Sequence, residues 1–113
     1  GCNAIINLRD GYPALVNDDE TVAHIWNAIR SYNKTCEAEQ RIKITECEEM
    51  SMTVDDFAYY TAACKGAYFY LGSGFSDREN SGVHTSTFLA NEDCIRTGIA
   101  AYTAFTIHAC GLV

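Results

Sequence analysis

The sequence predicts an α/β fold in which helices cover both faces of a mainly parallel sheet, giving three layers. Short segments with the pattern of strands alternate along the chain with longer segments of helical periodicity, in the order strand, helix, strand, helix, strand, helix. The third of these strands, residues 67–71, is apolar or aromatic at every position, as a strand covered on both faces should be. At 113 residues the chain suits one domain of this kind.

The first expected element is a strand over residues 3–9. Ala4, Ile6 and Leu8 fall on one face, and the segment stops at a turn that contains Pro13. A turn of this kind also joins separate lobes of a protein. The strand over residues 3–9 is therefore a candidate to belong to a different sheet from the other two expected strands.

A helix over residues 18–34 is expected next. Asn17 is the predicted cap, and Glu20, three residues later, is its capping-box partner. Apolar residues then recur at helical spacing, at Val22, Ile25, Trp26, Ile29 and Tyr32.

The middle of the chain predicts a short strand and a second helix. Residues 41–45 alternate apolar and polar side chains, as a half-exposed strand does. The helix is expected to begin near residues 54–56, where Asp55 and Asp56 complement its dipole. Adjacent helical residues point about 100° apart, so these two carboxylates do not form an acid and base pair, and capping is the favoured role of Asp55.

The last part of the chain predicts a strand, a loop and a helix. After residues 67–71 a loop rich in glycine and serine runs to Ser86, and Asn91 is expected to cap a final helix that ends at Gly111. The glycines of this loop do not form a phosphate-binding motif, because no lysine follows them and no third glycine opens a helix.

Composition excludes several classes of function. The chain has 8 basic and 15 acidic residues and a net charge of −7, which argues against binding nucleic acid or anionic lipid. No apolar run is long enough to cross a membrane. The six cysteines are widely spaced and form no CxxC pair, so we expect free thiols in a reducing compartment, the cytoplasm.

The three histidines are the candidate metal ligands. His24 lies inside the first expected helix and His108 in the last turn of the final one, where structural and dipole-capping roles are favoured. His84 lies in the loop that follows residues 67–71. From the residues alone it is either a surface histidine or one metal ligand, and one histidine does not build a hydrolytic metal site.

Four segments in order resemble the C-terminal portion of the amidohydrolases that cleave N-acyl amino acids. These enzymes include hippurate hydrolase, the indole-acetyl-amino-acid hydrolases and related zinc aminoacylases and carboxypeptidases. The similar segments are residues 11–17, residues 55–60, residues 67–74, and His84 together with Phe88, Asn91, Glu92 and Gly98. Two departures are Thr85-Ser86, where the family usually has Asn-Pro, and Thr53-Val54, where it has Gly-Ser.

The resemblance implies that the chain is a fragment of a metal-dependent amidohydrolase. Residues 1–12 would be the terminal strand of a lid or dimerisation domain with its hinge, and residues 13–113 the C-terminal part of the catalytic domain. His84 would be one ligand of a centre of two divalent ions, with zinc, manganese and nickel not distinguished. The remaining ligands and a general-base glutamate would lie upstream, so the chain would hold no catalytic residue and would be inactive alone.

The resemblance also suggests Asp56 and Gly72 as residues of the substrate pocket, with an N-acyl amino acid or a small peptide as substrate. The alternative is a non-catalytic α/β scaffold or interaction module. In either case an apolar strand at residues 67–71 needs sheet partners, and we expect the chain to self-associate if they are missing.

Overall fold

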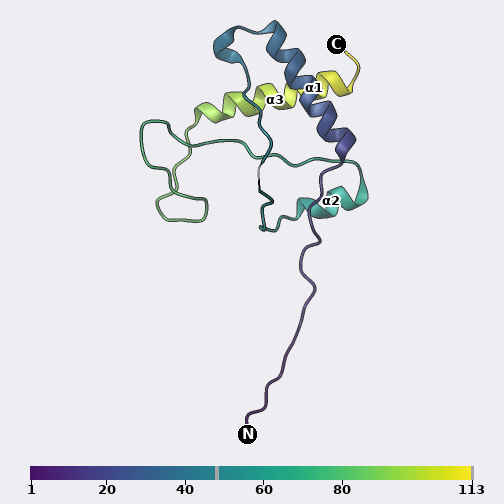
Figure 1. Ribbon diagram of the computed structural model, residues 1–113, viewed down its shortest axis with the longest axis vertical. Helices are drawn as coiled ribbons and strands as arrows, with labels where there is room; N and C mark the ends of the chain where they lie inside the picture. Colours follow the sequence, from purple (N-terminus) through teal and green to yellow (C-terminus); the bar gives the residue numbers. More distant parts are fainter. Residues whose placement is uncertain (48, 113) are drawn as a thin grey trace.

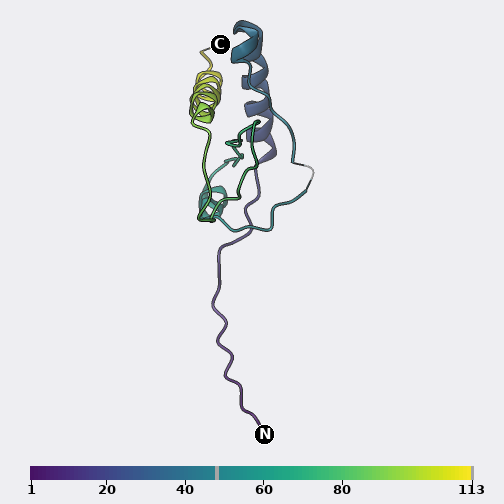
Figure 2. The same ribbon diagram turned by 90° about the vertical axis from the view of Figure 1, so that its left-hand side faces the viewer.

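Three α-helices and long extended segments make up the chain in a computed structural model that describes residues 1–47 and 49–112. The helices among these residues are α1 (Asp19–Thr35), α2 (Phe57–Ala63) and α3 (Asp93–Ala109), and a short 3₁₀ helix spans Ala38–Gln40. α1 packs against α3 (Figures 1 and 2). The first residues form an extended arm that projects away from the helices, so the molecule measures 71 × 38 × 21 Å.

The predicted α/β fold is wrong for the described part of the chain. Residues 1–47 and 49–112 contain no strand, so neither the sheet, the three layers nor the N-terminal strand over residues 3–9 is present. Residues 3–9, 41–45 and 67–71 run without regular structure instead. The physical reason is that a strand is defined by pairing with a second backbone, and none of these segments forms a ladder with another.

Asparagine side chains hold two of these segments in place of a neighbouring strand. The Asn33 amide of α1 donates to the Ile42 carbonyl and accepts from the Ile42 N–H, both at 2.8 Å. Asn17 does the same for Tyr68, donating at 2.9 Å and accepting at 2.7 Å. A primary amide carries one acceptor and two donors, so it satisfies both backbone groups of one residue. We call such a two-bond contact an asparagine clasp.

The start of α1 differs from the predicted capping box. Asp18, rather than Asn17, caps the helix, and its Oδ1 accepts from the Thr21 N–H and the Thr21 hydroxyl, both at 2.8 Å. The Thr21 N–H bond is the main cause that lowers the pKa of Asp18, since it favours the carboxylate. Glu20 pairs with Lys65 instead of reaching back to the cap. The helix itself is confirmed.

The core is small and lies between α1 and α3. Three buried residues form it: Ile29 of α1 (4% exposed), Ala101 of α3 (6%) and Ile42 of the extended segment 41–45 (8%). They contact one another. Partly buried residues pack around them: Ile25, Tyr32, Ile44 and Ala100. The Asn33 clasp therefore holds Ile42, the buried residue of the extended segment 41–45, in the core.

The segment over residues 67–71 is held by aromatic contacts as well as by its clasp. Tyr68 lies 5.8 Å from Phe57 of α2 and Phe69 lies 5.4 Å from Tyr102 of α3, between ring centroids. The nearby Asp55 carboxylate is the main cause that raises the pKa of Tyr68. These contacts link α2 to α3 and set where the following loop begins.

The C-terminal end of α3 confirms the prediction that the helix ends at Gly111. This glycine has a φ of 65°, in the left-handed region that suits a residue without Cβ. Leu112 N–H donates to the Ile107 carbonyl and Gly111 N–H to the His108 carbonyl, both at 3.1 Å. This pair of bonds is the Schellman arrangement.

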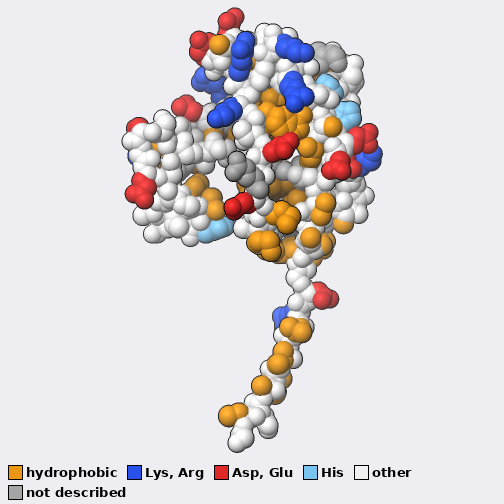
Figure 3. All heavy atoms as spheres, in the orientation of Figure 1, with side chains coloured by type: hydrophobic (Ala, Val, Ile, Leu, Met, Phe, Trp, Pro, Cys, Tyr) orange, Lys and Arg blue, Asp and Glu red, His pale blue; other side chains and the backbone are white. Residues whose placement is uncertain are grey.

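Much apolar surface remains exposed around this core. Along the arm, Ile5, Ile6 and Leu8 are 80–93% exposed, and Figure 3 shows apolar side chains along its length. On α3, Ile95, Ile99 and Tyr102 are also exposed, although they recur at helical spacing as an apolar stripe. In residues 1–47 and 49–112, no helix is long and apolar enough to cross a membrane.

Candidate functional site

His84 lies in the loop between residues 67–71 and α3, and its backbone is unusual. Its φ is 65°. Within the described part of the chain, no other residue except glycine has a positive φ. Left-handed backbone costs a residue with a Cβ roughly 1–2 kcal/mol, although histidine adopts it more often than most. Its side chain is exposed to solvent. The loop therefore presents an imidazole from a strained backbone position.

Short-range hydrogen bonds on both sides of His84 hold this turn. The Thr85 hydroxyl donates to the Gly82 carbonyl at 2.8 Å, and the Phe88 N–H donates to the Thr85 carbonyl at 3.2 Å. The hydroxyls of Ser81 and Thr87 are hydrogen-bonded at 2.8 Å. None of these contacts uses the imidazole, so the turn fixes the backbone and leaves the ring available.

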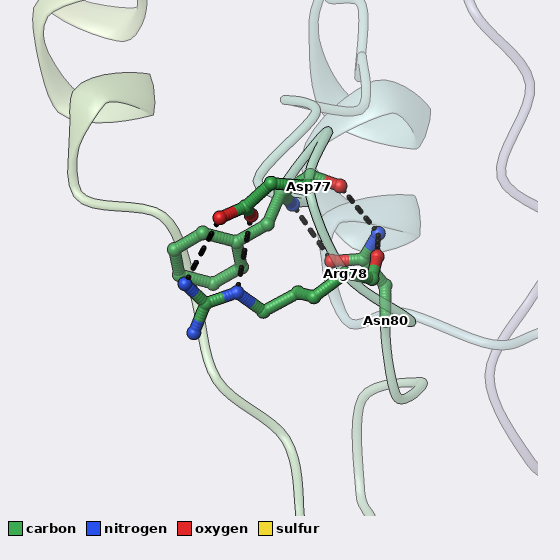
Figure 4. A network of polar contacts seen from close by, with 4 residues as sticks. Asp77, Arg78 and Asn80 are labelled. Atoms are coloured by element: carbon green, nitrogen blue, oxygen red, sulfur yellow. Dashed lines mark hydrogen bonds and ion pairs between the residues drawn. The ribbon is translucent and has the colours of Figure 1, made fainter.

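A third asparagine clasp orders the preceding part of the loop (Figure 4). Asn80 accepts from the Phe75 N–H at 2.7 Å and donates to the Phe75 carbonyl at 2.8 Å. The Arg78 guanidinium lies 4.4 Å from the centroid of the Phe75 ring and pairs with Asp77 at 3.1 Å. A Cβ on Gly74 would lie 3.2 Å from the Asn80 amide, so a larger residue there would require the clasp to shift.

Sequence reasoning missed this clasp. The available signal was an asparagine in a loop of small polar residues, where its amide commonly bonds nearby backbone. That signal marks a turn but does not say which residue the amide bonds.

The two suggested pocket residues are exposed, as His84 is. Asp56 precedes α2, is exposed and makes no side-chain capping bond, while Asp55 accepts from the Phe57 N–H at 2.8 Å and so confirms its predicted capping role. Gly72 is exposed, and a Cβ there would have no neighbour within 4 Å. No close backbone approach therefore requires glycine at position 72.

An apolar cavity of about 200 Å³ lies where the three helices meet residues 67–71. Its lining includes Ile25, Phe57, Phe69, Tyr102 and Phe105, with Lys65 also in its wall. His84, Asp56 and Gly72 do not line it. The cavity is thus separate from the loop that carries the predicted metal ligand.

A complete metal site is not present in the described residues. No group of three or more histidine, cysteine, aspartate or glutamate side chains is placed to hold an ion in residues 1–47 and 49–112. His84 offers one imidazole, and a hydrolytic centre needs three or more protein ligands. These residues alone do not fit a two-metal centre.

The comparisons with known proteins cover almost the whole chain. The family model described as Peptidase family M20/M25/M40 matches residues 3–108. A probable hydrolase of Synechocystis sp. is 35% identical over 100 residues, which are 88% of this chain and 24% of that protein. An uncharacterized hydrolase of Sinorhizobium fredii is 32% identical over 92 residues, which are 81% of this chain and 21% of that protein.

The chain spans about a quarter of the length of these curated relatives. No solved structure matches it.

Proposed function

Because the chain belongs to peptidase family M20/M25/M40, we propose that it forms part of a metal-dependent hydrolase that cleaves the amide bond of N-acyl amino acids or small peptides. The relatives named as hydrolases support the general class of reaction. The amide specificity rests on the resemblance of four segments, the last of which contains His84. A reducing compartment, the cytoplasm, is proposed from the wide spacing of the cysteines.

His84 is the residue proposed to contribute to the metal centre of the whole enzyme. The observation that supports this role is its φ of 65° in an exposed turn, since strained backbone at non-glycine residues clusters at functional sites. Divalent ions held there in the whole enzyme would supply an activated water and a Lewis acid for the scissile carbonyl, with zinc, manganese and nickel not distinguished. The other ligands and the general base are proposed to lie outside these 113 residues.

Three further parts of the proposal rest on the resemblance. Asp56 and Gly72 are kept as residues of the substrate pocket. The division into residues 1–12, from a lid or dimerisation domain, and residues 13–113, from the catalytic domain, stays a prediction. The chain on its own is expected to have no hydrolytic activity.

Replacing His84 tests the role on a chimaera in which this chain takes the place of the matching segment of the Synechocystis hydrolase. We expect His84→Ala and His84→Asn each to lower the release of amino acid from an N-acyl amino acid at least about 100-fold. Asparagine tolerates left-handed backbone, so it preserves the turn while removing the imidazole. Full activity of the His84→Asn chimaera would refute the assignment.

The His84→Gly variant of the 113-residue chain tests the backbone strain at position 84 independently of any metal binding. Glycine adopts positive φ without a Cβ clash, so we expect the free energy of unfolding to rise by roughly 0.5–1 kcal/mol. Urea denaturation measures the change. A matched substitution at exposed Thr103 in the middle of α3, Thr103→Gly, is expected to lower stability instead.

We also propose that the 113-residue chain self-associates through its exposed apolar side chains. This exposed apolar surface is the observation that favours the interaction-module alternative. Ile5 and Ile6 on the arm and Ile99 on α3 are 64–90% exposed. Light scattering should give an apparent mass that rises with concentration, and Ile5→Lys with Ile6→Lys should reduce the rise. A strict monomer at high concentration contradicts the proposal.

A further inference from the structure

Two histidines that are far apart in the sequence meet where α1 packs on α3. The rings of His24 and His108 have centroids 5.6 Å apart and are inclined by 64°. His24 belongs to α1 and His108 to the last turn of α3. Neither residue lies in the His84 loop, so the pair is a separate feature of the molecule.

The environment of the pair leaves one nitrogen without a partner. His108 Nδ1 is buried and makes no hydrogen bond to the described residues. A neutral imidazole has one nitrogen that accepts, and a buried acceptor without a partner is unfavourable. Glu20 Oε1 lies 3.9 Å from Nε2 of His24, while Glu20 Oε2 pairs with Lys65. A cation between the rings would give the imidazole lone pairs a partner beside this carboxylate.

We propose that His24 and His108 together bind one divalent ion of the zinc, nickel or copper type and thereby link α1 to α3. Imidazole nitrogens bind such ions at about 2.0–2.1 Å, which places two ring centroids roughly 5–6 Å apart around a tetrahedral ion. The observed 5.6 Å lies in this range. Rotation about χ2, a torsion with broad minima, changes which ring nitrogen an imidazole presents without moving its centroid far.

The site has a limited affinity and a definite preference. Residues 1–47 and 49–112 supply no cluster of three ligating side chains, so water completes the coordination of an ion held by two imidazoles. Nitrogen ligands of this kind follow the order copper above zinc and nickel, and they bind magnesium or calcium poorly.

The test is calorimetric titration of the 113-residue chain with Zn²⁺ and Ni²⁺, with all cysteines alkylated so that thiolates do not bind the metal. We expect His24→Ala and His108→Gln each to raise the Kd at least about tenfold, and Asn27→Ala, at an exposed position of α1, to leave it unchanged. Mg²⁺ should not bind.

Thermal unfolding gives an independent readout, since an ion that links the helices raises the midpoint of the native chain. We expect Ni²⁺ to raise the midpoint for the native chain and for Asn27→Ala, but not for His24→Ala. Circular dichroism of each variant without metal checks that its helices form. An unchanged Kd in a folded His24→Ala, His108→Gln double variant overturns the proposal, as does an unchanged midpoint of the native chain with saturating Ni²⁺.

Discussion

Replacing Ile29 by alanine is expected to lower the free energy of unfolding by about 2–4 kcal/mol. Ile29 is 4% exposed and joins Ile42 and Ala101 in the core between α1 and α3. Removing its branched side chain loses the transfer free energy of the buried carbons and leaves a cavity. Because few apolar side chains are buried in the described residues, little remains to compensate the loss.

Urea denaturation followed by circular dichroism measures this change. The matched control is Ile5→Ala on the arm, where the side chain is 90% exposed and the expected change lies within about 0.5 kcal/mol. Equal losses for the two variants would contradict the core described above.

Replacing Asn33 by alanine is expected to cost about 1–3 kcal/mol, because it removes two hydrogen bonds and leaves both backbone groups of Ile42 unpaired. Asn33→Asp keeps an acceptor for the Ile42 N–H but cannot donate to its carbonyl, so an intermediate loss is expected. The matched control is Asn27→Ala, an exposed asparagine on the same helix. It undergoes the same gain in helix propensity without loss of a clasp.

The midpoint and slope of urea unfolding give the free energy of unfolding of each of these three variants. A loss for Asn33→Ala no larger than for Asn27→Ala would show that the clasp contributes nothing. A loss for Asn33→Asp equal to that for Asn33→Ala would show that both bonds are needed together.

The helices were predictable because their signals are local. Apolar residues at helical spacing predict a helix over residues 18–34, and α1 spans Asp19–Thr35. The glycine at 111 likewise marks the end of α3 because only the preceding turn is involved. The choice of cap failed because Asn17 and Asp18 both suit that position, and the distant Tyr68 decided between them by engaging Asn17.

The strands were not predictable because a strand depends on a partner that its own residues do not name. Residues 67–71 have the composition of a strand covered on both faces, but no second segment in the described residues pairs with them. The same limit applies to the histidines. The resemblance singled out His84 but not its positive φ, which depends on the hydrogen bonds of its own turn. The contact between His24 and His108 depends on how α1 packs on α3, which the sequence of neither helix states.

The three asparagine clasps have a consequence for the way this molecule opens. A β-ladder distributes its bonds over many residues, so its loss is cooperative, whereas each clasp closes on one residue through one side chain. Ile42, Tyr68 and Phe75 are held by different asparagines. Each clasp therefore breaks by rotation of one side chain, in a fluctuation that does not require the other two clasps to break.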